Sequence, residues 1–281
     1  MVFDGGSTDR TIEILRGFGE GVSYWESRAD RGQAHAINKG FDRASGELVA
    51  WQNSDDCYYP GAFAAVASAA AMHPDVDVFY GDKDYVDFEG RFLFTAWARD
   101  PHDFSNMIPW PCVHNEVTFV RRRVLETGLR LNESRRHYMD YEFFWDLLLA
   151  GKRFMHVPGI RAGFRQHPNA KTSTQGEVAQ REAFEIYVKV WRSGKLNGAS
   201  MSAMAAAIWN ECRNDFAAAR WSLFIEHMRQ ARGVIGRPRL PRDLRIKRLL
   251  VRLPPTFRDR LIGFGRGLRE KCRQAGSLRR V

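Results

Sequence analysis

The sequence predicts an α/β protein, because short apolar strands alternate with helical segments along its first 165 residues. Apolar residues recur at helical spacing in residues 32–44 and again in residues 137–150. This alternation is typical of a mixed, largely parallel sheet flanked by helices. The expected strands lie at residues 2–3, 22–25, 47–52, 77–80, 117–120 and 154–157.

The chain opens at the end of a strand, Val2-Phe3, which leads directly into the polar segment Asp4-Gly-Gly-Ser-Thr-Asp9. Glycines permit a tight turn and Ser, Thr and Asp cap helices, so a helix with Ile12 and Leu15 on its apolar face is expected next. A helix N-terminus attracts anions, and the Asp4 carboxylate can accept hydrogen bonds from a base or a ribose. Taken alone, a capped turn without a ligand is the simpler interpretation.

The sharpest polar cluster is Asn53-Ser54-Asp55-Asp56, directly after the apolar strand at residues 47–52. In open parallel sheets, ligands bind beyond the carboxyl ends of strands. Adjacent acids repel each other and favour a compensating cation, and their hard oxygens suit Mg²⁺ or Mn²⁺, which commonly bridges to substrate phosphates. A turn that precedes the helix opened by Pro60 is an equally weighted alternative.

Two later segments also carry candidate residues. Asp140 stands near the start of the helix expected at residues 137–150. An acid there usually only complements the helix dipole, but facing a cleft it can act as a general base. Arg165, His167 and Lys171 place three potential cations in one loop, where they can clamp a diphosphate; a solvated surface loop is the alternative.

The C-terminal part differs in character from the rest. Residues 176–231 are predicted to be helical throughout. The tail at residues 232–281 holds 16 Lys/Arg and 3 Asp/Glu, whereas residues 1–231 hold 27 and 30. Leucines between these arginines predict contact with an anionic membrane surface, and a solvated tail fits equally well. No motif supports nucleic-acid binding, so no nucleic-acid partner is expected.

The four cysteines are Cys57, Cys112, Cys212 and Cys272, and no two form a Cys-x-x-Cys pair. Neither a zinc site nor a disulfide framework is therefore indicated, and a reducing compartment fits best. No run of 18 or more apolar residues occurs. We expect a cytoplasmic protein that is at most peripheral at the inner membrane face.

Taken in order, the motifs resemble family 2 glycosyltransferases. The match covers about residues 2–175, and any one of its motifs alone is weak. Four stretches carry it: Asp4-Gly-Gly-Ser-Thr-Asp-Arg-Thr-Ile-Glu-Ile-Leu15, Asp30-Arg-Gly-Gln-Ala-His-Ala-Ile-Asn-Lys-Gly40, Ala44 to Gly61 around Asn53-Ser-Asp-Asp56, and Met139-Asp-Tyr-Glu-Phe-Phe144.

The resemblance implies a GT-A fold and an inverting transfer of a sugar from a nucleotide-sugar donor to a hydroxyl of a saccharide or lipid-linked acceptor. Asp140 matches the acid that removes the acceptor proton. Asn53-Ser54-Asp55 stands where the family carries Asp-x-Asp, so Asp55 would hold Mg²⁺ or Mn²⁺ on the donor diphosphate, with Asp56 close by.

The resemblance also implies the remaining nucleotide contacts. Asp4 would contact the nucleobase, and Arg31 and Lys39 lie in the segment that lines the donor pocket. The loop cations Arg165, His167 and Lys171 would close over the phosphates. On this basis the domains are residues 1–175 (transferase), 176–231 (helical extension) and 232–281 (basic tail).

Three departures from the family pattern bear on activity. The family's first strand would precede Met1 and is absent from this sequence, so we expect an unpaired edge on a neighbouring strand. Either translation begins upstream of the given start, or the product is a fragment with damaged activity. Asn53 replaces the first acid of Asp-x-Asp, and Met139 stands where many relatives have Glu.

Two other functions stay open at this stage. The missing strand favours a truncated, non-catalytic module that binds sugar nucleotides or a partner protein. A metal-dependent phosphohydrolase that uses Asp55 and Asp56 is the third possibility, although no second cluster of His and Asp supports it.

Overall fold

The computed structural model describes residues 1–168, 170–171, 176–236, 241–255 and 262. Within it, the chain forms two compact units, residues 1–207 and 208–281, which divide inside one helix. The sequence instead places the end of the transferase domain near residue 175, and that boundary stays a prediction.

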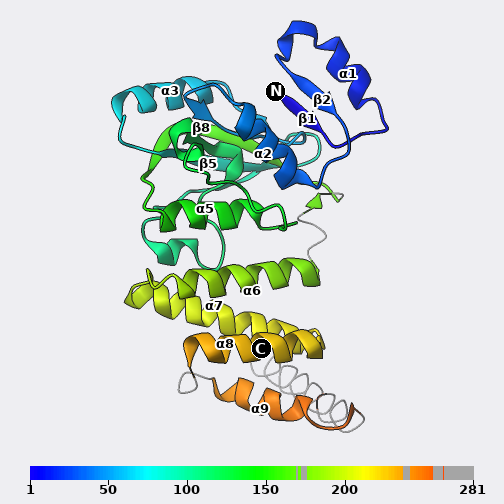
Figure 1. The fold of residues 1–281 in the computed structure, drawn as a ribbon, viewed down its shortest axis with the longest axis vertical. Coiled ribbons are helices and arrows are strands. Elements are labelled where there is room, and N and C mark those ends of the chain that lie inside the picture. The colour runs from blue at the N-terminus through cyan, green and yellow to red at the C-terminus, as the bar shows by residue number, and fades with distance from the viewer. Residues whose placement is uncertain (169, 172–175, 237–240, 256–261, 263–281) are drawn as a thin grey trace, which may run out of the picture. The chain divides into compact units, whose positions relative to one another are not determined.

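The first unit contains two separate sheets (Figure 1). Strands β1 (Val2–Asp4) and β2 (Trp25–Ser27) pair in parallel and form a small sheet of their own. The larger sheet has the strand order β3-β7-β5-β8-β4, and β6 pairs with β5. Its strands are β3 (Leu48–Val49), β4 (Cys57–Tyr58), β5 (Val78–Val86), β6 (Phe92–Ala96), β7 (Thr118–Arg121) and β8 (Phe154–Arg165).

Helices surround these sheets. Helix α3 packs against β8 and β5, and α2 packs against β1. The α-helices of this unit are α1 (Thr11–Gly17), α2 (Gln33–Arg43), α3 (Ala62–Met72), α4 (Arg122–Leu125), α5 (Met139–Leu149), α6 (Glu177–Arg192) and the first part of α7 (Gly198–Ala217). Short 3₁₀ turns lie at η1 (Gly19–Gly21), η2 (Phe104–Met107) and η3 (Asn115–Val117).

The predicted fold class is confirmed, with a mixed sheet flanked by helices. Pairing is parallel between β1 and β2 and between β5 and β8, and antiparallel in the other described pairs, so the large sheet is less parallel than expected. Both β5 and β8 extend well beyond the apolar runs that predicted them. Charged residues interrupt the apolar pattern in the second half of β5, where Asp84 pairs with Arg161 of β8 and Lys83 pairs with Glu116 of η3.

The register of β5 against β8 shifts at Gly81. A Cβ atom at this position would lie only 2.0 Å from the carbonyl oxygen of Ile160. Only glycine lets the two backbones approach this closely, so Gly81 permits the irregularity that aims the following residues of β5.

The core lies on both sides of the large sheet. One cluster joins α3 to the sheet through Val66, Ala69, Phe79 and Ile160. An aromatic cluster joins α2, the chain after β3 and α5: the ring centroids of Phe41 and Trp51 are 5.6 Å apart. Trp51 also contacts Phe143 and Phe144, at 6.0 and 6.4 Å. These contacts hold the carboxyl end of β3 beside α5.

The second unit is helical and contains the remainder of α7, α8 (Trp221–Ile235) and α9 (Arg242–Val251). Its buried centre is polar as well as apolar. The Asp215 carboxylate lies 2.7 Å from Nδ1 of His227 and 3.2 Å from Nε of Arg220. Most of the predicted basic tail, including Cys272, lies outside the described residues. No helix in the described ranges is both long and apolar enough to cross a bilayer.

Candidate active site

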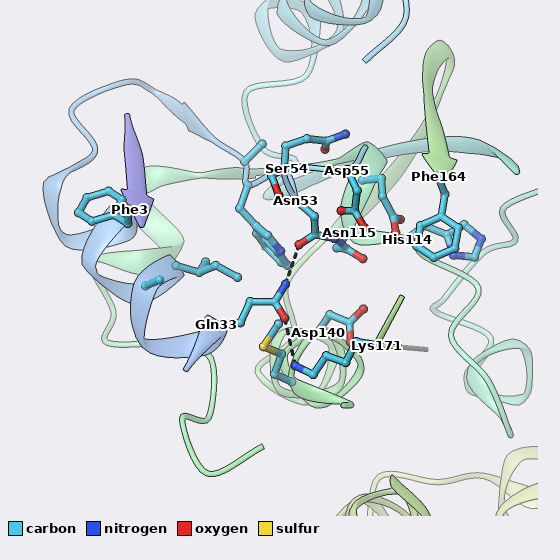
Figure 2. Close-up of a pocket in the computed structure, with 18 of the residues that line it drawn as sticks. Phe3, Gln33, Asn53, Ser54, Asp55, His114, Asn115, Asp140, Phe164 and Lys171 are labelled. Atoms are coloured by element: carbon cyan, nitrogen blue, oxygen red, sulfur yellow. Dashed lines mark hydrogen bonds between the residues drawn. The ribbon is translucent and has the colours of Figure 1, made fainter. Parts of the chain in front are cut away.

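A cavity of about 1110 Å³ opens in the first unit (Figure 2). Segments far apart in sequence form its walls: β1, α2, the chain after β3, β5, the loop at residues 110–116, the start of α5 and the chain after β8. Figure 2 shows Phe3 and Phe164 towards opposite sides of the view, with the turn at residues 53–55 between them. Ligand pockets commonly measure about 300–1,000 Å³, so this cavity exceeds the space that one small molecule requires.

The turn after β3 places two of the predicted residues in the cavity wall, Asn53 and Asp55. Oδ1 of Asn53 accepts a hydrogen bond from Nε2 of Gln33 at 2.6 Å, and its Nδ2 donates to Asp56 at 3.0 Å. Oδ2 of Asp55 lies 3.1 Å from Nε2 of His167. The predicted loop residue and the predicted metal ligand therefore meet directly.

Asp56 is the last residue of this turn, and Arg165 hydrogen-bonds to it. The backbone N–H of Arg165 donates to Oδ1 of Asp56 at 3.0 Å, and its Nε donates to the carbonyl oxygen of Asp55 at 3.0 Å. Burial raises the pKa of Asp56 to about 6, against the lowering effect of these hydrogen bonds. Arg165 thus orders the acidic turn with its side chain and its backbone.

Lys171 lines the same cavity and reaches the turn through a chain of hydrogen bonds (Figure 2). Its Nζ donates to Oε1 of Gln33 at 3.1 Å, and Gln33 in turn donates to Asn53. Burial lowers the pKa of the Lys171 amine. Gln33 was not predicted as a site residue, although it lies within the second motif of the family resemblance.

Asp140 lies in the first turn of α5 and lines the cavity. Its Oδ1 accepts the backbone N–H of Tyr141 at 2.8 Å. With the amide nitrogen of Asn115 turned towards it, that nitrogen lies 3.2 Å from Oδ2 of Asp140. Burial raises the pKa of Asp140, and the nearby Lys83 opposes this effect. The cavity therefore contains a carboxyl group that favours proton uptake.

Lys83 and Glu116 complete the charged wall, and the sequence did not indicate either of them. They form a buried ion pair of 3.5 Å between β5 and η3, and Lys83 interacts electrostatically with Asp140. Burial raises the pKa of Glu116. The only available signal was a lysine inside the otherwise acidic run Gly81-Asp-Lys-Asp84 at a predicted strand end.

Six predicted nucleotide contacts lie outside the cavity lining: Asp56, Arg165 and His167, which contact the turn or belong to it, and Asp4, Arg31 and Lys39, which lie elsewhere. Asp4 accepts hydrogen bonds from the backbone of Gly6 and Ser7, at 3.0 and 2.9 Å, and from Ser27 Oγ at 2.6 Å, which together lower its pKa to about 2. Gly5 and Asp30 line the cavity nearby. Asp4 therefore ties the turn to β2 in this conformation.

Arg31 and Lys39 are engaged by neighbouring acids. Nε and Nη2 of Arg31 donate to Oε2 of Glu133 at 2.9 and 2.6 Å, and Lys39 forms an ion pair with Glu26. Neither Arg31 nor Lys39 lines the cavity. Their contact with a nucleotide stays a prediction, as does that of Asp4.

The donor set of the turn fits a hard cation, although the described residues contain no cluster of three or more His, Cys, Asp or Glu arranged around one point. Asp55 supplies a carboxylate that is about 39% exposed and borders the cavity. One carboxylate with a second acid behind it suits Mg²⁺ or Mn²⁺, which usually takes its other ligands from water and substrate phosphates.

Comparisons with known proteins show which proteins this chain resembles. Residues 1–129 match the model of "Glycosyl transferase family 2". An uncharacterized glycosyltransferase of Mycobacterium tuberculosis is 34% identical over 82 residues, which cover 29% of this chain and 31% of the relative. A PGL/p-HBAD biosynthesis glycosyltransferase of the same species is 33% identical over 165 residues, covering 56% and 62%.

Among solved structures, Staphylococcus aureus TarS 1-349 in complex with UDP-GlcNAc aligns with a TM-score of 0.57 at 16% identity, over 77% of this chain and 63% of that chain. The fold is therefore that of the GT-A glycosyltransferases. The similarity to glycosyl transferase family 2 covers residues 1–129 of this chain. It spans between about a third and two thirds of the length of the relatives it matches.

Proposed function

We propose that this protein transfers a sugar from a nucleotide-sugar donor to a hydroxyl group of an acceptor, with Asp140 as the general base. The observation that carries the proposal is that Asp140 and Asp55 line one cavity in a family 2 glycosyltransferase domain. Acid–base chemistry requires a proton acceptor in the same cleft as the reacting groups, and the partly buried Asp140 carboxylate meets this requirement.

The donor would lie along the turn at residues 53–56. TarS was solved with UDP-GlcNAc, which supports a nucleoside-diphosphate sugar as the donor class. Lys171 and His167 border the turn and can pair with the phosphates of the donor. Asp4, Arg31 and Lys39 would contact the nucleoside only after exchanging their present partners for it.

A divalent cation, Mg²⁺ or Mn²⁺, would be held by Asp55 on the donor diphosphate. When bound, it neutralises the negative charge that develops on the departing nucleoside diphosphate. Asn53 orients the turn through its hydrogen bonds to Gln33 and Asp56, and Asp56 adds negative charge behind the ligand. Addition of a chelator should reduce donor binding by the wild-type chain.

The chemical step follows from these positions. Asp140 removes the proton from the acceptor hydroxyl, whose oxygen attacks the anomeric carbon as the bond to the diphosphate breaks. One displacement inverts the configuration at that carbon. Lys83 helps to keep Asp140 ionised between turnovers, because its positive charge opposes the effect of burial.

The test combines two measurements on one substitution. Asp140→Asn should lower sugar transfer by about 10²- to 10⁴-fold, the usual contribution of a positioned base, while calorimetry finds unchanged binding of a UDP- or GDP-sugar with Mn²⁺. Asp75→Asn, at a half-exposed surface acid, is the matched control and should leave both unchanged. Full transfer by Asp140→Asn would refute the assignment.

A non-catalytic binding module is the second candidate. It is favoured by the separation of β1 from the large sheet beside the cavity. In that case the wild-type chain should bind a sugar nucleotide, and no acceptor should yield free nucleoside diphosphate.

We further propose a saccharide or lipid-linked acceptor at the cytoplasmic face of a membrane. The relative named for PGL/p-HBAD biosynthesis supports a glycolipid acceptor. Helix α9 supports membrane contact, because Ile246 and Leu249 are 61% and 64% exposed beside the basic Arg245 and Arg248. The chain should sediment with phosphatidylglycerol vesicles and not with phosphatidylcholine vesicles; equal binding to both would contradict electrostatic attachment.

A further inference from the structure

Large apolar side chains gather on the hairpin that β5 and β6 form, where water reaches them. Phe88 lies in the turn, Phe92, Leu93 and Phe94 lie on β6, and Trp97 follows β6 directly. All five are between 46% and 69% exposed. Single exposed apolar residues are common on folded proteins, but a contiguous group marks a surface that another apolar body covers. We call these five residues the β6 apolar edge.

A β-bulge turns this surface to both sides of the sheet. Tyr85 of β5 pairs with Phe94. The next residue of β5, Val86, pairs with Phe92, which leaves Leu93 as an extra residue in β6. Side chains of paired residues share a face, and consecutive residues of a strand point to opposite faces. Phe94 therefore lies on one face of the hairpin and Phe92 on the other.

Strand β6 is also an edge strand. Among the described residues it pairs only with β5, so the backbone groups of its other edge have no neighbouring strand. Water and lipid headgroups can pair with such groups at a membrane interface, whereas the hydrocarbon core cannot. The hairpin is therefore suited to shallow insertion at the interface and not to crossing the bilayer.

The charged residues of the hairpin do not oppose insertion to this depth, because they are paired. In the turn, Nε of Arg91 lies 2.6 Å from Oδ2 of Asp87, and its Nη2 lies 2.9 Å from Oε2 of Glu89. At the other end, the guanidinium of Arg161 lies over the ring of Trp97, 5.9 Å from its centroid. Tryptophan beside a long basic side chain is typical of the boundary between the apolar and polar layers of a membrane.

The β6 apolar edge is continuous with the cavity. The ring of Phe94 stacks on Tyr85 with 4.3 Å between centroids, and Tyr85 meets Phe164 edge-on at 5.2 Å. Tyr85 and Phe164 both line the cavity (Figure 2). Nη1 of Arg165 donates to the carbonyl oxygen of Phe88 at 2.5 Å, which ties the hairpin to the residue that orders the acidic turn. A bilayer in contact with the hairpin would therefore lie beside the cavity.

We propose that the β6 apolar edge inserts into the interface of a lipid bilayer and holds the cavity beside the membrane surface. A bilayer surrounds whatever enters it and so covers both faces of the hairpin. A sugar ring or a second copy of the chain packed on one face would leave the other face in water. The apolar area removed from water supplies the affinity, and the hairpin itself needs no excess of positive charge. This surface is separate from α9, and the inference does not rest on the proposed sugar transfer.

Binding of the full chain to phosphatidylglycerol vesicles tests the proposal. The double substitution Phe92→Ser with Leu93→Ser removes one aromatic and one aliphatic side chain and leaves the stack of Phe94 on Tyr85 in place. It should weaken binding to the vesicles by about 10-fold or more. The melting temperature without vesicles should stay that of the wild-type chain.

The matched control is Ile14→Ser with Phe18→Ser, which removes the same kinds of side chain, 53% and 60% exposed, from α1 and its C-terminal end. It should leave vesicle binding unchanged. An equal loss in both double variants would overturn the proposal, as would unchanged binding of the hairpin variant.

Trp97 reports insertion without any loss of binding. Phosphatidylglycerol with brominated acyl chains quenches tryptophans that enter the bilayer, so the wild-type chain should lose a larger fraction of its fluorescence than Trp97→Phe. Equal quenching of the two chains would overturn the proposal. Dimers of the wild-type chain that form without lipid and are lost in the Phe92→Ser, Leu93→Ser variant would assign the surface to a second copy and overturn it as well.

Discussion

Asp56 imposes a stability cost that should depend on pH. Its folded pKa of about 6 exceeds the ordinary 3.8 because burial disfavours the charged form. Below the ordinary value, the carboxyl is protonated in both states and costs nothing. As pH rises from about 4 to 6, the unfolded chain releases its proton first, and the folded chain loses stability. The pKa difference corresponds to about 3 kcal/mol, which we reduce to about 1–2 kcal/mol because the group is partly solvated.

Asp56→Asn removes this cost and keeps the shape of the side chain. The loss of one hydrogen bond from Asn53 costs about 1 kcal/mol at every pH, so only the pH-dependent part is diagnostic. Urea unfolding at pH 4 and pH 7.5 should show the variant gaining about 1–2 kcal/mol relative to wild type at the higher pH. A difference that is constant across this range would refute the reasoning.

Asp4 provides the control of opposite sign. Its folded pKa of about 2 lies below the ordinary value, because hydrogen bonds from Ser27 and Ser7 stabilise the charged form. Its contribution is present above pH 4 and is lost as pH falls towards 2. Asp4→Asn should therefore lose its destabilising effect in acid, whereas Asp56→Asn should lose its relative gain there.

Two further substitutions test the supports of Asp140. Glu182 on α6 accepts hydrogen bonds from the backbone N–H groups just before α5, those of Arg136, His137 and Tyr138, at 2.6, 2.9 and 3.0 Å. Glu182→Gln should lower the free energy of unfolding by about 1–3 kcal/mol and reduce kcat more than donor affinity. An unchanged kcat would separate this contact from catalysis. Lys83→Met leaves Glu116 buried without its ion pair and should lower the free energy of unfolding in urea by about 3–5 kcal/mol. In the protein that still folds, the low-pH side of the pH–rate profile for transfer should move to higher pH. An unchanged profile would exclude Lys83 from control of the Asp140 pKa.

The sequence located the acidic turn and Asp140 because both are local signals. Polar residues directly after an apolar strand mark a strand end, and Asp140 is marked by the start of a helix. That the two line one cavity depends on the packing of Trp51 against Phe143, which no local pattern specifies. The order of the motifs in the family resemblance supplied this information instead.

The partners of the charged residues were beyond local reasoning. Arg31 pairs with Glu133, about 100 residues later in the chain, and Lys83 pairs with Glu116 across two elements. A cation in a donor-pocket motif therefore looked available when an acid from another segment already engaged it. The second halves of β5 and β8 were missed for the same reason. Charged residues interrupt the apolar pattern of β5, but long-range partners neutralise them, as Arg161 of β8 does for Asp84.

The charge balance of the cavity gives these observations a common consequence. Asp140 and Glu116 share Lys83 as a nearby cation, and burial raises the pKa of both acids. Asp55 and Asp56 add two further acids in the turn after β3, where Asp55 contacts His167, and Lys171 interacts electrostatically with Asp140. A bare diphosphate would add still more negative charge to this wall, whereas a diphosphate that arrives with a divalent cation would not. Donor affinity should therefore depend on the metal more strongly than on any single basic residue of the loop.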